Sequence, residues 1–120
     1  MTKLIFHILN LIFFILYLYP GSILGFVIYR NFEKQPQITP DFFAISSNHV
    51  YAFAILSFFG FFNYFKSHKN LIIGYFFSIS IIFELLHLII PFRSFQFSDL
   101  FGNIIGVLFS LLIFSIWRKK

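Results

Sequence analysis

Residues 71–90, LIIGYFFSISIIFELLHLII, decide the fold of this chain. A run of this length can cross a hydrocarbon layer of about 30 Å, which takes roughly 17 to 25 helical residues. Its only acidic or basic residue, apart from His87, is Glu84. The run therefore predicts a transmembrane helix that stops at Pro91.

Three other apolar runs have a similar character, at residues 4–19, 48–65 and 99–117. Lipid offers no partner to an unpaired backbone group, so each run is expected to be a helix. The alternation typical of outer-membrane strands is absent. A cleaved signal peptide is an alternative for the first run, but the small-residue cleavage site is missing. We predict an all-α membrane protein with a four-transmembrane-helix bundle, forming one domain over residues 1–120.

The composition also indicates that lipid is the solvent of this chain. Apolar residues make up 59% of it and charged residues 11%, against roughly a half and a quarter in soluble proteins. The absence of cysteine excludes disulfides, thiolate metal sites and cysteine nucleophiles. A net charge of +5 could suggest nucleic acid. The basic residues instead gather at the ends of the runs, so we expect no nucleic-acid partner.

The basic residues predict the orientation of the bundle, because they favour the cytoplasmic side. If both termini are cytoplasmic, the basic residues on that side are Lys3, Lys66, Lys69, Arg118, Lys119 and Lys120. Those on the outer side are Arg30, Lys34 and Arg93. Aromatic residues near the helix ends have the positions of interfacial anchors: Tyr17, Tyr19, Tyr64 and Trp117.

The longest loop, residues 20–47, lies on the outer side in this topology. It contains a short apolar piece, GSILGFVIY at residues 21–29. The piece is too short to span a membrane, so we expect it to lie in the interface or to re-enter slightly. Nothing in the sequence assigns it a role.

Polar residues converge on the outer half of the predicted bundle. They are His49, Glu84, His87, Arg93, Asp99 and Asn103. Glu84 stands six residues before Ile90, about 9 Å below the expected helix end. A carboxylate in hydrocarbon costs roughly 2.5 to 3.5 kcal/mol on insertion scales, so it needs a partner. We expect Arg93 to offset the buried acids, with His49 and His87 as the other available partners.

Several of these residues also have an ordinary structural interpretation. Asp99 suits the first turn of a helix, where an acid favours the positive end of the dipole. Asn103 could join helices by a hydrogen bond, and Gly102 with Gly106 forms the G-x-x-x-G pattern of close helix packing. These interpretations do not account for Glu84.

A metal site is the alternative for three residues of this set. Glu84 and His87 share one helical face, and His49 would add a ligand from a second helix, as in bundle-core metal sites. The chain has no second Glu-x-x-His and only one acid well inside a run. We therefore predict no metal and no cofactor. Because no G-x-S-x-G motif is present either, catalytic residues stay unassigned.

Two stretches resemble the VanZ-like family of small integral membrane proteins. They are HVYAFAIL at residues 49–56 and FELLHLIIPFRSFQFSDLFGNIIGVLFS at residues 83–110. The residues that match the family's order are His49, Glu84, Arg93, Ser98, Asp99, Asn103 and Gly106. The resemblance covers about residues 45–115, and YPGS at residues 19–22 also fits.

The sequence departs from the family pattern at two places. The Asp-Lys pair that usually precedes the histidine is replaced by AISSN at residues 44–48. His87 stands where the family has glutamine, which makes the local protonation state depend on pH. The first departure weakens any role that needs the extra ion pair.

The resemblance implies a four-helix, multi-pass protein of the plasma (inner) membrane and the cell envelope. The family takes its name from a protein associated with resistance to the glycopeptide teicoplanin. The leading hypothesis is that the polar cluster engages a membrane lipid or a lipid-linked cell-wall precursor. One alternative is an intramembrane enzyme acting on a lipid-linked or peptide substrate, with Glu84 or Asp99 as general base. Another is a structural subunit that associates with a second membrane protein.

Overall fold

The apolar runs fold as helices in the computed structural model, which describes residues 1–120. The chain is all-helical, without strands beyond one isolated bridge between Phe42 and Ile45. The helices are α1 (Thr2–Leu18), α2 (Ile23–Tyr29), α3 (Ser47–Tyr64), α4 (Lys69–Leu86) and α5 (Phe97–Lys119). Three of the predicted helices, over 4–19, 48–65 and 99–117, agree closely with α1, α3 and α5.

The end of α4 differs from the prediction. The helix ends at Leu86 and not at Ile90. Residues 87–90 form a tight turn in which the amides of His87, Leu88 and Ile89 each bond a carbonyl three residues back. Such bonds belong to the tighter 3₁₀ geometry that often finishes a helix. Glu84 therefore lies in the last turn of α4, and the expected depth of about 9 Å below the helix end is wrong.

The short apolar piece after α1 forms a helix of its own. α2 is bent by 84° from α1. The break contains Pro20 and Gly21, and Gly21 has a φ of +99°, which a side chain would strain. The hydroxyl oxygen of Ser22 then caps α2 by accepting a hydrogen bond from the amide of Gly25 at 2.9 Å. This geometry turns the chain sideways across the end of the bundle.

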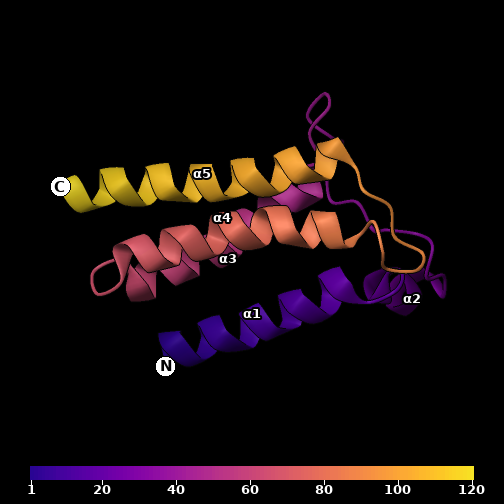
Figure 1. The fold of residues 1–120 in the computed structure, drawn as a ribbon, viewed down its shortest axis with the longest axis horizontal. Coiled ribbons are helices and arrows are strands. Elements are labelled where there is room, and N and C mark those ends of the chain that lie inside the picture. Colours follow the sequence, from indigo (N-terminus) through magenta and orange to yellow (C-terminus); the bar gives the residue numbers. More distant parts are fainter.

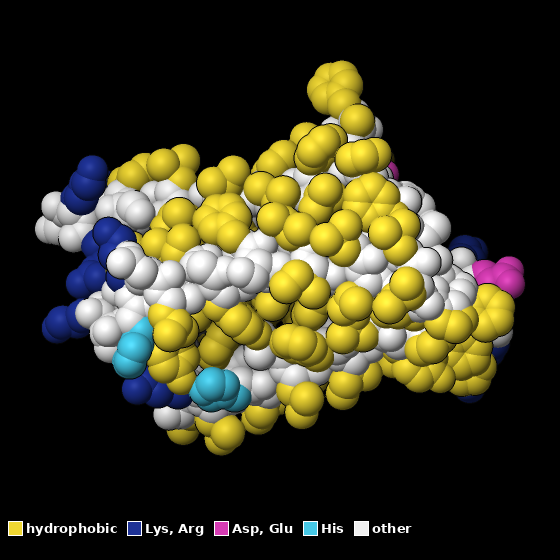
Figure 2. Space-filling model, viewed as in Figure 1, with side chains coloured by type: hydrophobic (Ala, Val, Ile, Leu, Met, Phe, Trp, Pro, Cys, Tyr) yellow, Lys and Arg dark blue, Asp and Glu magenta, His cyan; other side chains and the backbone are white.

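The long helices α1, α3, α4 and α5 run lengthwise beside one another (Figure 1). Both termini and the α3–α4 turn lie at one end, which we call the basic end. α2 and the α4–α5 loop lie at the opposite end, which we call the polar-core end. Figure 2 shows Lys and Arg side chains gathered at the basic end, with apolar side chains covering the length between the ends.

The closest helix pair is α3 with α5, and two glycines make the approach possible. A Cβ at Gly102 would stand 2.7 Å from the carbonyl oxygen of Ser46 and 2.9 Å from Cβ of His49. A Cβ at Gly106 would stand 2.6 Å from the carbonyl oxygen of Val50. Side chains at these two positions would force the backbones apart. The G-x-x-x-G pair thus brings the first turns of α5 directly against α3.

Apolar residues fill the interior and also cover the outside. Phenylalanine dominates the buried core, in Phe6, Phe53, Phe61, Phe76, Phe83 and Phe114. Large apolar side chains such as Leu71, Val27 and Leu112 are more than half exposed on the outer surface. α4 and α5 are long and apolar enough to cross a membrane, and α1 with α2 adds a third span if the bent pair counts as one. The predicted four spans are thus supported for two or three helices.

Candidate functional site: a buried polar cluster

The polar cluster forms where three helix ends meet at the polar-core end. α3 begins beside the end of α4 and the beginning of α5, as Figure 1 shows. His49 lies in the first turn of α3, Glu84 in the last turn of α4, and Asp99 in the first turn of α5. Asn103 follows one turn deeper in α5. The helix directions therefore gather side chains that are up to 54 residues apart in sequence.

Asn103 is the buried centre of this cluster, with no exposed surface. Its Nδ2 donates to the carbonyl oxygen of Ser80 at 3.0 Å, and its Oδ1 lies 2.7 Å from Nδ1 of His49. Because an amide oxygen only accepts, Nδ1 of His49 must carry the proton. The other ring nitrogen of neutral His49, Nε2, is then an unprotonated acceptor. It lies 3.6 Å from Oδ2 of Asp99.

Glu84 is fully buried and only half satisfied. One carboxylate oxygen accepts a hydrogen bond from the backbone amide of Gln96 at 2.8 Å. The other, Oε2, has no hydrogen-bond partner within the chain. Nδ1 of His87 is 3.3 Å from Oε2, without hydrogen-bond geometry. A buried carboxylate oxygen in this state is rare, because most buried polar atoms are paired.

His87 and Arg93 both bind the C-terminal end of α1. Nε2 of His87 lies 2.8 Å from the carbonyl oxygen of Tyr17, to which it donates. Arg93 donates from Nη2 to the carbonyl oxygen of Leu16 at 2.7 Å and from Nε to that of Tyr19 at 3.1 Å. These carbonyls have no partner inside the helix, and the helix C-terminus attracts positive charge. His87 therefore fixes α1 to the end of α4, and Arg93 fixes it to the α4–α5 loop.

The expected direct pairing of Arg93 with the buried acids does not occur. The acids lie beside histidines instead: His49 is 3.6 Å from Asp99, and His87 is 3.3 Å from Glu84. Partial burial lowers the pKa of Arg93 below its ordinary value, while the more distant negative charges of Asp99 and Glu84 oppose this shift. Arginine stays protonated at any physiological pH. Arg93 is thus a permanent positive charge beside the cluster, held by α1 carbonyls.

His49, Glu84 and Asp99 form the tightest group of ligand-type atoms. One such atom from each lies within 4.8 Å of the other two. The side chains of His49 and Asp99 are 15% and 20% exposed, whereas that of Glu84 is 0% exposed. The group therefore has a closed side at Glu84 and an accessible side at His49 and Asp99. His87 is close to Glu84 but outside this group.

Tyr17 belongs to the cluster, although its position near a helix end suggested an interfacial anchor. Its ring packs edge-on against His49 and Phe53, with centroids 5.2 and 5.5 Å apart, and stacks over His87 at 6.4 Å. Its hydroxyl is 3.4 Å from Nδ1 of His49. The sequence also did not predict two backbone partners, the carbonyl of Ser80 and the amide of Gln96. A backbone partner leaves no signal in residue type.

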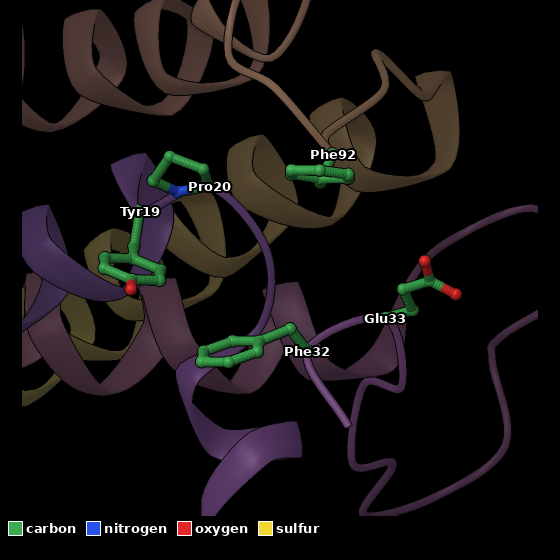
Figure 3. Close-up of a pocket in the computed structure, with 5 residues that line it drawn as sticks. All are labelled: Tyr19, Pro20, Phe32, Glu33 and Phe92. Atoms are coloured by element: carbon green, nitrogen blue, oxygen red, sulfur yellow. The ribbon is translucent and has the colours of Figure 1, made fainter. Parts of the chain in front are cut away.

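A largely aromatic recess lies on the surface beside Tyr19, whose carbonyl oxygen accepts a hydrogen bond from Nε of Arg93. Its volume is about 250 Å³, and it is lined by Tyr19, Pro20, Phe32, Glu33 and Phe92. Figure 3 shows the rings of Tyr19, Pro20, Phe32 and Phe92 around the opening. Phe92 is 81% exposed and has a φ of +61°, an uncommon backbone conformation for a bulky residue. The recess thus combines exposed aromatic surface with an adjacent guanidinium.

Comparison with protein-family models, curated proteins and solved structures gave no match to this chain. The chemistry of the site therefore rests on its own geometry. Two carboxylates, two imidazoles and a carboxamide share one buried junction, and a fixed guanidinium lies at its edge. Such a group can bind a cation on its accessible side, exchange protons, or lock helices together.

Proposed function

We propose that this chain is a VanZ-like, multi-pass protein of the plasma membrane whose polar-core end engages a lipid or lipid-linked glycan headgroup of the cell envelope. The observation that carries the proposal is the position of Arg93 beside an exposed aromatic recess. Arg93 uses Nε and one N–H of Nη2 on α1 carbonyls. Its other N–H groups make no hydrogen bond within the chain and suit the oxygens of a phosphate.

The proposed topology has four spans, with the basic end in the cytoplasm. Its support is the cluster of basic residues at the end that carries both termini (Figure 2). α1 has 17 residues and α3 has 18, so both are near the length that a span requires. The polar-core end would then face the outer side, where lipid-linked wall precursors are used. The recess would contact the apolar part of the same ligand.

The acids of the cluster contribute to this function indirectly. Anionic Glu84 and Asp99 would repel a phosphate, so they cannot be its direct partners. They lie behind Arg93 and oppose the lowering of its pKa. His87 and Arg93 both bind α1, and Glu84 accepts from the α4–α5 loop that carries Arg93. The cluster would therefore fix the loop and the guanidinium in one position.

The test is protection of a sensitive host against teicoplanin at matched membrane abundance. We expect the wild-type chain to protect, and both Arg93→Gln and Asp99→Asn to lose protection. Arg30→Gln is the matched control, because Arg30 is an exposed arginine of the outer loop with no ion pair. Co-purified lipids should be enriched in phosphate-bearing species in wild type and Arg30→Gln only. Absence of protection from the wild-type chain would refute the link to glycopeptides.

A purely structural role is the second candidate, favoured by one observation. The hydrogen bonds of the cluster join α1, α3, α4 and α5 to one another. If their only purpose is to hold helices, Glu84→Gln should lower folded protein and protection in proportion. If the cluster supports a binding surface, protection should fall further than the amount of folded protein does. The ratio of the two quantities decides between the candidates.

A further inference from the structure

The group formed by His49, Glu84 and Asp99 brings three hydrogen-bond acceptors close together. Nε2 of His49 is an acceptor in the neutral ring, because Nδ1 is committed to Asn103. Asp99 faces this nitrogen with a carboxylate oxygen. Two acceptors in contact repel unless a proton or a metal ion lies between them. Glu84 adds a third acceptor, because one of its carboxylate oxygens lies within 4.8 Å of the ligand atoms of His49 and Asp99. Its Oε2 is fully buried and has no hydrogen-bond partner.

The distances favour a metal ion over a proton. A hydrogen bond from a protonated His49 to Asp99 would bring the two atoms to about 2.7 to 2.9 Å. They are 3.6 Å apart. Two ligands that are each about 2.0 to 2.2 Å from one tetrahedral ion stand roughly 3.3 to 3.6 Å from each other. The spacing of His49 and Asp99 already fits, and Glu84 has a carboxylate oxygen within 4.8 Å of both.

We propose that His49, Glu84 and Asp99 form a binding site for one divalent transition-metal ion of the zinc type. One imidazole nitrogen and two carboxylate oxygens suit Zn²⁺, whereas Mg²⁺ and Ca²⁺ prefer oxygen alone. A double positive charge also matches the two carboxylates. The bond from Nδ1 of His49 to Asn103 orients the ring, as a hydrogen-bond partner usually does behind a metal-binding histidine.

The arrangement leaves one coordination position open toward the accessible side. Three protein ligands with an exposed fourth position are typical of zinc sites that bind water or a substrate. The exposed edges of His49 and Asp99 give an ion its path, while Glu84 forms the closed floor. This set differs from the predicted alternative of His49, Glu84 and His87. Nε2 of His87 donates to Tyr17, and its Nδ1 lies 3.3 Å from Oε2 of Glu84. The three side chains whose ligand atoms all lie within 4.8 Å of one another are His49, Glu84 and Asp99.

The proposal does not rest on the envelope function and can be tested on the purified full chain. The protein is prepared in detergent without a histidine tag, and Zn²⁺ binding is measured by equilibrium dialysis with elemental analysis. We expect one Zn²⁺ per chain. His49→Gln and Asp99→Asn should weaken binding by at least about 100-fold, and Asn103→Ala by about 10-fold to 100-fold.

The matched control removes the histidines at the other end of the bundle. His7 and His68 are exposed, so His7→Gln combined with His68→Gln should bind like wild type. Loss of Zn²⁺ in this control, or equal binding by wild type and Asp99→Asn, would overturn the proposal. Zinc X-ray absorption of the wild-type protein needs no variant. One imidazole with oxygen ligands supports the site, and two or more imidazoles contradict it.

Discussion

Polar side chains at the two ends of the bundle have opposite environments. At the basic end, Lys66, Lys69 and Arg118 are exposed and make no ion pair, so water or headgroups must solvate them. At the polar-core end, Glu84 and Asn103 have no exposed surface and bond across helices. The basic end therefore presents its charged groups to the surroundings, whereas the polar-core end also holds polar groups inside the protein. The same substitution should have very different effects at the two ends.

The largest contrast is expected between two arginines. Arg93→Gln removes charged hydrogen bonds to the end of α1 and should lower the free energy of unfolding by about 1.5 to 3 kcal/mol. Arg118→Gln at the basic end should change it by less than about 0.5 kcal/mol, because Arg118 is exposed. Unfolding in mixed micelles, followed by circular dichroism, measures both. If the two variants lost the same unfolding free energy, the contacts of Arg93 with α1 would not contribute to stability.

The next contrast is between two glycine-to-alanine substitutions, each of which adds one methyl group. Gly102→Ala places Cβ against the backbone of α3 and should destabilise the fold by about 1 to 3 kcal/mol. A Cβ at Gly74, in the α4 half nearer the basic end, has nothing within 4 Å. Gly74→Ala should therefore stabilise the helix by about 0.5 to 1 kcal/mol. The sign of the change distinguishes the two sites in the same unfolding assay, and a shared sign would contradict the close α3–α5 contact.

Two asparagines provide a smaller contrast. Asn103→Ala leaves the carbonyl of Ser80 and the Nδ1 proton of His49 unpaired inside the protein. Because polar contacts in membrane proteins contribute about 0.6 kcal/mol on average and about 1.7 at most, we expect a loss near the upper value. Asn63→Ala removes exposed bonds to Thr2 and should lie near or below the average. Thermal unfolding of the two variants measures this difference. A larger loss for Asn63→Ala than for Asn103→Ala would contradict the prediction.

The smallest effect is expected for the hydroxyl of Tyr17. Its distance of 3.4 Å to His49 is too long for a strong hydrogen bond. Tyr17→Phe keeps the ring contacts with His49 and Phe53, so stability should change by less than about 0.5 kcal/mol. Tyr17→Ala is the contrasting variant, with a loss of about 3 kcal/mol or more. A large loss of stability in Tyr17→Phe would contradict this, because it would mean that the hydroxyl bond to His49 is strong.

The sequence predicted the helices and the gathering of the polar residues, but not their pairing. Helix positions follow from long apolar runs and from Pro20 and Gly21, which are local signals, whereas Pro91 did not locate the end of α4. The partners of Arg93 and His87 are backbone carbonyls of α1, and these depend on how helices pack. Local patterns thus locate a buried acid such as Glu84, whereas its bonding partners can be identified only from the three-dimensional arrangement.

The orientation of the two ends across a membrane is the central claim of this account. The chain has no cysteine, so single cysteines can report accessibility without background. Ser94→Cys lies in the exposed α4–α5 loop of the polar-core end, and Ser67→Cys in the exposed α3–α4 turn of the basic end. A membrane-impermeant maleimide applied to intact cells should label Ser94→Cys, and should label Ser67→Cys only after permeabilisation. Labelling of Ser67→Cys alone, or of both variants equally, in intact cells would contradict the account.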